Sequence, residues 1–214
     1  MISQNEILNF LKTKSSGLGL INKLKVIYRP LICPFDVLLN YVKPNESTYD
    51  IGCGSGQFCS LIAKFTDAKK IFGIEISENL IENAILLNQE FKTKKKMHFN
   101  TFDGKIIPLE IKNFSLIYLI DVLHHVPKFQ QETFFKEIYS KMAINSKLVF
   151  KDIDAESNFV VFNKIHDLIF SKEIGNEIGF NQAKILTQKT GFKLVDCFKK
   201  RMFVYPHYFL ILEK

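Results

Sequence analysis

The sequence predicts an α/β fold in which a doubly wound, mostly parallel sheet carries helices on both faces. Short apolar stretches typical of buried strands alternate with longer stretches of helical periodicity along most of the 214 residues. This alternation favours parallel strands, because each helix returns the chain to the start of the next strand. With 47% hydrophobic residues the chain can bury a full core. We therefore expect a single domain overall.

The expected elements follow one another in a regular order. Residues 1–45 read as a helix-rich arm or cap, and residues 46–214 read as the α/β domain. Strands are expected at 47–52, 70–75, 97–102, 114–121, 147–153, 192–198 and 204–212. Helices fill the gaps between them, at 56–66, 77–91, 129–143, 157–172 and 180–190.

The last two strands have a different kind of connection. Only residues 199–203 separate them, which is too short for a parallel crossover, so an antiparallel hairpin is expected. The basic residues at 199–201 should then lie at the carboxyl ends of the parallel strands, where ligands bind in open α/β sheets. The lysine run at 92–96 precedes a strand and is expected on the opposite edge as a solvated charge run.

The stretch DIGCGSG at residues 50–56 predicts a loop that binds a nucleotide cofactor. Glycines at alternate positions let the backbone turn sharply and approach a ligand, and the following helix offers free N–H groups. A dinucleotide loop would need a third glycine where Gln57 or Cys59 stands. A P-loop is excluded, because no Gly-Lys-Ser/Thr sequence follows.

Acidic residues follow the next three predicted strands. Glu75 ends an apolar strand about twenty residues after the glycine loop, the position that meets a ribose in doubly wound sheets. Asp103 follows the third strand. Asp121 ends a near-continuous apolar strand and opens the sequence DVLHH at residues 121–125.

These four segments, in this order and spacing, resemble the class I S-adenosylmethionine-dependent methyltransferases, in particular the small-molecule, ubiquinone-methyltransferase-like type. The resemblance covers about residues 45–214, marks residues 46–214 as a Rossmann-like methyltransferase domain, and implies the strand order 3-2-1-4-5-7-6 with the last strand antiparallel. It also implies S-adenosylmethionine as the cofactor, with S-adenosylhomocysteine as the product. No metal is expected, because the four cysteines have no companion histidine at the spacing of a zinc site.

The resemblance assigns roles along the loops. It places Glu75 on the ribose hydroxyls, Asp103 on the adenine amino group and Arg29 on the methionine carboxylate. The expected cofactor-binding residues are Arg29, Asp50, Gly52, Cys53, Gly54, Gly56, Glu75, Ile76, Asp103, Asp121 and Val122.

Direct methyl displacement needs mainly alignment of two ligands and exclusion of water, and a base only for a hydroxyl or acidic carbon. The catalytic candidates are His124, His125, Asp152 and His207. The alternative is that the histidine pair only shapes the cofactor pocket. Acids at the end of the fifth strand are expected beside the start of the last one. The substrate-binding candidates are Asp154, His166 and Tyr205.

The sequence favours a small or lipid-like acceptor with O- or C-methylation. The Asn/Asp-Pro-Pro-aromatic loop of amino-methylating nucleic-acid enzymes is missing after the fourth strand, so nucleic acid is not the expected partner. The helix at 157–172, rich in apolar residues, is expected to act as a lid suited to a greasy acceptor. A nucleic-acid methyltransferase and a non-catalytic cofactor-binding protein stay open as alternatives.

The sequence lacks targeting, membrane-spanning and paired-cysteine patterns, and this predicts the location of the protein and the state of its cysteines. Residues 1–10 have no signal-peptide pattern, and no apolar run reaches the roughly 18 residues of a membrane span, so a cytoplasmic protein is expected. The four cysteines form no C-x-x-C pair and are expected to be reduced. The basic, amphipathic arm is expected to close the sheet, with peripheral membrane contact as the alternative. The sequence does not predict the oligomeric state.

Overall fold

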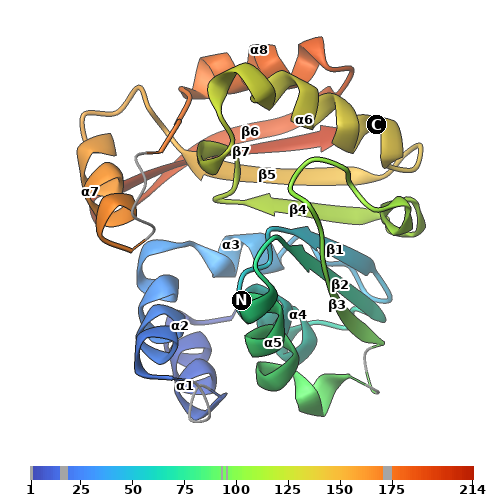
Figure 1. Ribbon diagram of the computed structural model, residues 1–214, viewed down its shortest axis with the longest axis vertical. Helices are drawn as coiled ribbons and strands as arrows, with labels where there is room; N and C mark the ends of the chain where they lie inside the picture. Colours follow the sequence, from blue (N-terminus) through green and yellow to red (C-terminus); the bar gives the residue numbers. More distant parts are fainter. Residues whose placement is uncertain (1, 15–18, 93, 95, 171–174) are drawn as a thin grey trace. The chain divides into compact units, whose positions relative to one another are not determined.

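The structure is a computed structural model that describes residues 2–14, 19–92, 94, 96–170 and 175–214. The chain forms two compact parts, residues 1–106 and residues 107–214. Each part contains its own strands and helices (Figure 1).

The first part begins with the arm and contains three strands. The arm helices are α1 (Gln4–Lys14), α2 (Leu20–Ile32) and α3 (Phe35–Leu39). The strands are β1 (Ser47–Ile51), β2 (Lys70–Glu75) and β3 (Met97–Thr101). β2 pairs in parallel with both neighbours, and α4 (Gln57–Phe65) and α5 (Glu78–Leu87) connect the strands. A short 3-10 helix, η2 (Gln89–Phe91), follows α5.

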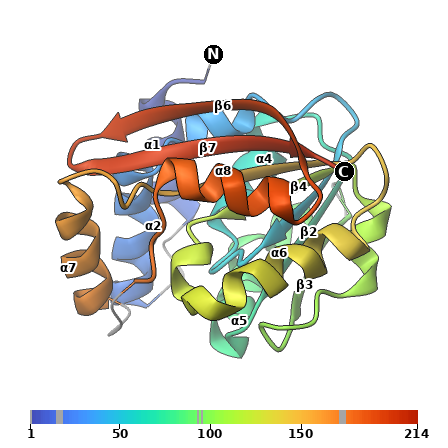
Figure 2. The ribbon, with the colours of Figure 1, turned by 90° about the horizontal axis from the view of Figure 1, so that it is seen from above.

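The second part contains four strands and three longer helices. The strands are β4 (Leu116–Ile120), β5 (Lys147–Ile153), β6 (Lys193–Met202) and β7 (Tyr205–Glu213). The helices are α6 (Lys128–Lys141), α7 (Val160–Phe170) and α8 (Phe180–Lys189), with short 3-10 helices η3 (Leu109–Asn113) and η4 (Leu123–His125). Figure 2 shows α6 and α8 side by side over one face of these strands.

The strand order is β3-β2-β1-β4-β5-β7-β6. β4 and β5 are parallel, whereas β7 is antiparallel to both β5 and β6. The predicted fold class, a seven-stranded, mostly parallel sheet of this order with an antiparallel β7, is confirmed. In open α/β sheets, ligands bind at the carboxyl ends of the strands.

The predicted position of the hairpin turn is wrong. β6 continues to Met202, and only Phe203 and Val204 join it to β7. The basic residues at 199–201 therefore belong to a strand instead of a loop. β6 is an edge strand with a half-exposed burial pattern, and such a strand accepts charged side chains on its solvated face.

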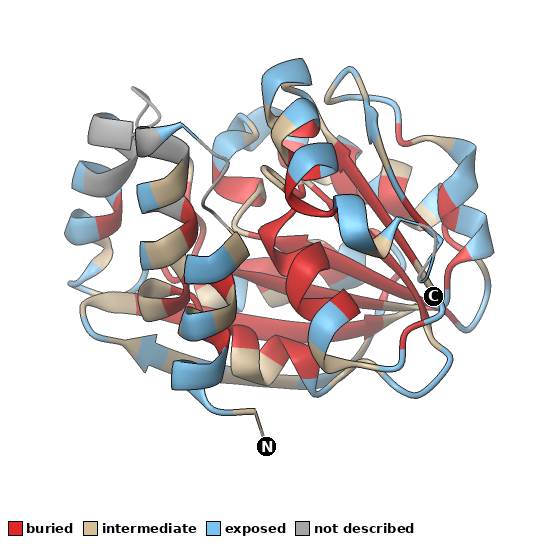
Figure 3. Cartoon of the chain, turned by 90° about the horizontal axis from the view of Figure 1, so that it is seen from below, coloured by how far each residue is buried: buried red, intermediate tan, exposed pale blue. Residues whose placement is uncertain are grey.

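The interior follows the pattern expected for parallel strands covered on both faces. β1 and β4 are buried at every position, and Figure 3 shows the buried residues concentrated in the strands. Aromatic side chains fill much of the core. Tyr49, Tyr118, Tyr208, Phe135 and Phe150 are among the largest fully buried side chains.

The arm packs on the helices of the first part. The ring of Phe10 in α1 lies edge-on to Phe65, with centroids 5.6 Å apart, and Lys14 pairs with Glu90 at 2.5 Å. In the described part of the chain, no helix combines the length and the apolar character that crossing a membrane requires.

A buried polar network joins α4 to α5. Asn88 is only 2% exposed, and its Nδ2 donates to the carbonyl of Gly56 at 3.1 Å and to that of Ala84 at 2.9 Å. Its Oδ1 accepts from the Ser60 hydroxyl at 2.7 Å. This amide therefore holds the end of the glycine loop at a fixed distance from α5.

We expect Asn88→Ala to lower the free energy of unfolding by about 2–4 kcal/mol, because it removes three hydrogen bonds and leaves buried partners unsatisfied. Urea denaturation measures the loss. Asn79→Ala on the same helix is the control, and since Asn79 is exposed its cost should stay within about 0.5 kcal/mol. Equal losses of unfolding free energy in the two variants would show that the Asn88 hydrogen bonds do not stabilise the fold.

Candidate functional site

The glycine loop adopts a backbone that only glycine adopts without strain. Gly52, Gly54 and Gly56 have φ angles of 74°, 54° and 70°. A Cβ on Gly56 would lie 2.8 Å from the Cβ of Ala84, whereas a Cβ on Gly54 would have no neighbour within 4 Å. The loop is therefore packed against α5 at its end and open at its middle, which leaves room there for a ligand.

Glu75 holds the middle of this loop. Its Oε2 accepts from the backbone N–H of Gly54 at 3.0 Å, and its Oε1 accepts from those of Ile76 at 2.8 Å and Ser77 at 3.3 Å. Hydrogen bonds to a carboxylate are about twice as strong as neutral ones, so the side chain is fixed in one orientation. A carboxylate held in this way could accept further hydrogen bonds from hydroxyl groups of a ligand.

An exposed apolar side chain and an acid lie next to Glu75. Ile76 is 64% exposed, and a Cβ on Gly104 would lie 3.2 Å from its Cγ2, so the turn after β3 touches it. The backbone N–H groups of Ile106 and Lys105 donate to Asp103 and hold the pKa of that carboxyl below its usual value. An apolar surface beside an ionised acid suits a purine base that carries an amino group.

Asp50 supports the loop from inside the protein. It is 3% exposed, and burial raises the pKa of its carboxyl to about 7, although the thiol of Cys59 and the charge of Arg29 favour the ionised form. The Cys59 thiol donates to Asp50 at 3.6 Å. Burial and the nearby carboxyl group raise the pKa of this thiol far above its usual value, so Cys59 stays a protonated donor.

In β2, the lack of a side chain at Gly73 leaves space for Cys53 of the loop and for Phe99. A Cβ at this position would lie 2.7 Å from the sulfur of Cys53 and 2.8 Å from the ring of Phe99. Gly73 and Asn88 both set the position of the loop, and neither stands in a sequence pattern that indicates this role. All four cysteines are free thiols.

The second part contains a buried histidine and acid pair. The Nδ1 of His124 lies 2.6 Å from Oδ1 of Asp152, whose Oδ2 accepts the backbone N–H of His124 at 3.2 Å. Oδ1 also accepts the N–H of Ile153 at 2.7 Å. A carboxylate can only accept, so Nδ1 of His124 carries the hydrogen in this contact and Nε2 is the other ring nitrogen. The ring of His125 lies beside that of His124, with centroids 4.2 Å apart.

A second ion pair fixes the end of β4. The ammonium group of Lys151 is fully buried and lies 2.5 Å from the carboxylate of Asp121, whose backbone N–H donates to the Lys151 carbonyl at 2.9 Å. Asp121 has a φ of 55°, which turns the chain sharply into Val122. Asp tolerates this left-handed conformation better than most residues. The start of the DVLHH segment is thus set by β5.

β5 and β7 bring several predicted residues to one place, but not all of their side chains meet. Asp152 pairs with Tyr208 and Ile153 with His207 across the two strands. Because side chains alternate between the faces of a sheet, Asp152 shares a face with Tyr208, and His207 points to the other face. The Tyr208 hydroxyl is buried and has no hydrogen-bond partner among the described residues, and burial raises its pKa far above the usual value. Tyr208 was not among the residues predicted from the sequence.

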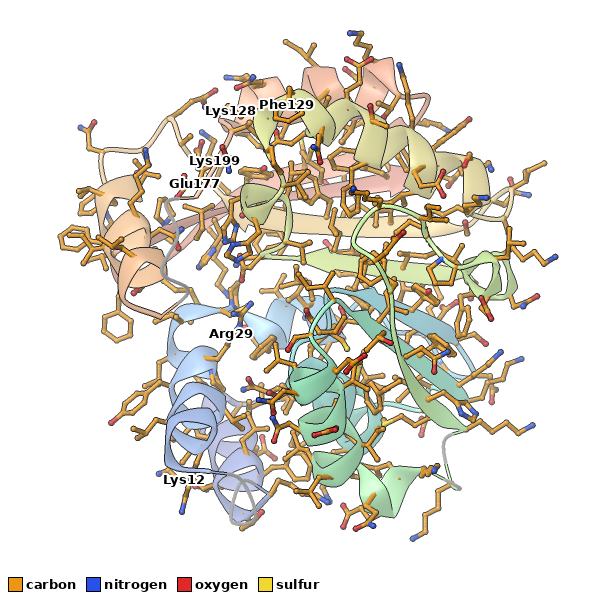
Figure 4. The ribbon with its side chains drawn as sticks, viewed as in Figure 1. Lys12, Arg29, Lys128, Phe129, Glu177 and Lys199 are labelled. Carbon is orange, nitrogen blue, oxygen red and sulfur yellow. The ribbon has the colours of Figure 1, made fainter. Side chains whose placement is uncertain are left out.

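Asp154 has several partners within its own part of the chain. Its Oδ1 accepts backbone N–H groups of Glu156 and Phe180 at 3.1 Å each, and its Oδ2 lies 2.7 Å from the ammonium of Lys199. These contacts raise the pKa of Lys199, which is labelled in Figure 4. Asp154 thereby joins the start of α8 to β6.

The other substrate-binding candidates are less tightly defined. Tyr205 is half-buried and begins β7 opposite Met202. His166 lies on α7, and its side chain is outside the part that the structure describes.

Gln131 on α6 ties together the loops around His124. Its Nε2 donates to the carbonyls of Val126 and Asn176 at 3.1 and 2.9 Å, and the N–H of Asn176 donates to the carbonyl of His124 at 2.6 Å. The histidine segment is therefore held on both sides. Among the residues that the structure describes, no group of three His, Cys, Asp or Glu side chains is arranged to hold a metal ion.

The geometry and the comparisons with known proteins define one class. The family model described as a methyltransferase domain matches residues 42–177, more than half of the chain, and the chain belongs to that family. The family match, the strand order and the glycine loop together identify a class I S-adenosylmethionine-dependent methyltransferase. The predicted family and enzyme class are confirmed.

Individual relatives are more distant. A carboxy-S-adenosyl-L-methionine synthase from Idiomarina loihiensis is 30% identical over 109 residues, which cover 50% of this chain and 44% of the relative. An O-methyltransferase from Pyrenophora dematioidea is 25% identical over 180 residues, covering 79% of this chain and 63% of the relative. The chain thus spans about half to two thirds of the length of these curated relatives.

A solved structure shows the same fold. The magnesium protoporphyrin IX methyltransferase from Synechocystis, solved with bound SAH, has a TM-score of 0.69 and 15% identity, and the match covers 96% of this chain and 93% of that one.

We expect the stability of the protein to depend on the ionisation of Asp50. The folded protein holds the Asp50 proton up to about pH 7, whereas the unfolded chain releases it near pH 4. The folded state binds more protons in this window, so the free energy of unfolding should fall as pH rises, by about 2–3 kcal/mol between pH 5 and pH 8.

Asp50→Asn should remove this contribution, and urea denaturation at pH 5 and pH 8 measures it. The difference in stability between the variant and the wild type should then shift in favour of the variant as pH rises. A difference that is the same at both pH values would contradict the raised pKa.

Proposed function

We propose that this protein transfers the methyl group of S-adenosylmethionine to a small or lipid-like acceptor, at an oxygen or a carbon atom. The observation that carries the proposal is the carboxylate of Glu75, fixed by three backbone N–H groups at the open middle of the glycine loop. The O-methyltransferase relative supports methylation at oxygen.

The residues present fit this cofactor. Glu75 would accept the ribose hydroxyls, Ile76 and Asp103 would hold the adenine, and Arg29 would meet the methionine carboxylate. Gly52, Cys53, Gly54 and Gly56 would form the backbone cradle, with Asp50 beneath it. The cofactor-binding roles of Asp121 and Val122 stay predictions. When bound, S-adenosylmethionine supplies a methyl group on a positively charged sulfur.

His124 is the best candidate for a base. Asp152 orients its ring and stabilises the positive charge that forms when Nε2 takes a proton. An acceptor hydroxyl within reach of Nε2 would lose its proton to this nitrogen as it attacks. The roles of His125 and His207 stay predictions, as do those of Asp154, His166 and Tyr205 with the acceptor.

The apolar residues of α7 support a greasy acceptor. Val161, Phe162, Ile165 and Leu168 are each about half exposed. Exposed apolar side chains on one short helix are typical of a surface that binds an apolar ligand or partner. α7 would therefore contribute contact area to the acceptor.

Formation of a carboxylated S-adenosylmethionine is a second candidate. It is favoured by the relative from Idiomarina loihiensis, which matches half of this chain. Mass spectrometry of the cofactor after incubation separates the two functions, because only this second function changes the cofactor to a carboxylated form. The cytoplasmic location, the low expectation of nucleic-acid partners and membrane contact through the arm stay predictions.

Binding of S-adenosylhomocysteine, measured by calorimetry, tests the cofactor site. Glu75→Gln should weaken binding by about tenfold to a hundredfold, because the charged acceptor for the ribose hydroxyls is lost. Glu78→Gln, at an exposed position three residues further on, is the matched control and should leave the affinity unchanged. Equal affinity of Glu75→Gln and wild type would show that the ribose is not held here.

The proposed base is tested by turnover on acceptors found in a small-molecule screen, with release of S-adenosylhomocysteine as the readout. His124→Asn should lower kcat by about a hundredfold, and Asp152→Asn should also lower it, while cofactor affinity changes little. His125→Asn, in the same loop, should lower kcat by a smaller factor than His124→Asn. A His124→Asn variant with normal kcat would leave the pair a purely structural role.

A further inference from the structure

α2 contains a break in its hydrogen bonding. Pro30 lies inside the helix and has no N–H, so the carbonyl of Val26, four residues earlier, lacks its helical donor. Pro34 stands four residues after Pro30 and lacks an N–H as well, so the Pro30 carbonyl is left without a donor from that position. Buried carbonyls in this situation need partners from elsewhere in the chain.

Two glutamine side chains supply those partners. The Nε2 of Gln57 donates to the Val26 carbonyl at 2.7 Å, and the Nε2 of Gln4 donates to the Pro30 carbonyl at 2.9 Å. Gln57 is 8% exposed, so water does not readily replace its hydrogen bond.

Gln57 connects two segments of the proposed cofactor site. It is the first residue of α4 and directly follows Gly56 of the glycine loop. Val26 lies one helical turn before Arg29, which Figure 4 labels at the end of α2. Arg29 is close enough for its charge to favour the ionised form of Asp50 and so lower the pKa of that carboxyl.

We propose that Gln57 is a positioning residue for cofactor binding: by occupying the acceptor that Pro30 leaves open, it fixes the turn that carries Arg29 against the glycine loop. This inference rests on the proposed cofactor site, in which Arg29 meets the methionine carboxylate. The other end of the arm has its own anchors, Phe10 on Phe65 and Lys14 with Glu90. Loss of the Gln57 amide therefore changes the placement of α2 locally and leaves the arm attached.

A comparison of two ligands tests this role. S-adenosylhomocysteine carries the amino-acid carboxylate, whereas methylthioadenosine shares the nucleoside and lacks that group. Gln57→Leu should weaken binding of S-adenosylhomocysteine by about tenfold and that of methylthioadenosine by less than about twofold. Gln89→Leu, at an exposed position on η2, is the control and should change neither affinity.

A double-mutant cycle with Pro30 tests the proposed cause. Pro30→Ala restores an N–H that can bond to the Val26 carbonyl within the helix, so Gln57 is no longer needed to hold that turn. In the Pro30→Ala background, Gln57→Leu should cost less than about threefold in affinity for S-adenosylhomocysteine.

Three outcomes overturn the inference. Equal weakening of both ligands by Gln57→Leu would show a general loss of structure. An undiminished loss in the Pro30→Ala background would show that the Val26 carbonyl is not the cause. Wild-type affinity in Gln57→Leu would refute the inference and leave the proposed function intact, whereas a wild-type protein that binds neither ligand would refute both.

Discussion

The carboxylate of Glu75 is the contact on which the glycine loop depends. It accepts N–H groups from the loop after β1 and from the residues that follow β2, so it fixes two segments to each other before any ligand arrives. The three glycines of the loop have left-handed backbone angles, which glycine adopts without strain. In the proposed site, ligand affinity and loop geometry would share one side chain, and preorganisation would reduce the entropy that binding must overcome.

In the second part of the chain, charged side chains likewise fix loops at the ends of strands. Asp152 holds the loop that follows β4 through His124, and Lys151 holds the start of that loop through Asp121. In each case a residue of β5 fixes a segment that follows the neighbouring strand. Loops fixed by adjacent strands place their side chains more accurately than loops that depend on their own hydrogen bonds, which is what in-line methyl displacement requires.

The topology could be predicted because it depends on local signals: apolar strands, helical periods, the glycine loop and a short last connection. The hairpin turn was misplaced because Lys199 and its neighbours read as a loop, although an edge strand accepts them.

The site was predicted residue by residue at the strand ends, and those roles stay predictions. Pairings over long sequence distances carry no such signal. Asp152 and Asp154 were expected beside the start of β7, but only the register shows that Asp152 stands opposite Tyr208, with His207 on the other face of the sheet.

Gln57 is an intermediate case. Pro30 within a helical pattern already indicates a carbonyl that needs a donor, but only the folded chain shows that the donor stands 31 residues away. Asn88 and Tyr208 gave no comparable signal, because a buried amide or phenol reads like any other in a linear sequence.

The pair of Lys151 and Asp121 has a consequence for how this protein can be altered. An ammonium group with no exposed surface is tolerated only beside its carboxylate, and either charge left alone in that environment would be far less favourable than both or neither. A single substitution at either position would leave an unpaired buried charge and destabilise the fold. A designer who wishes to repack this region must therefore exchange both residues together.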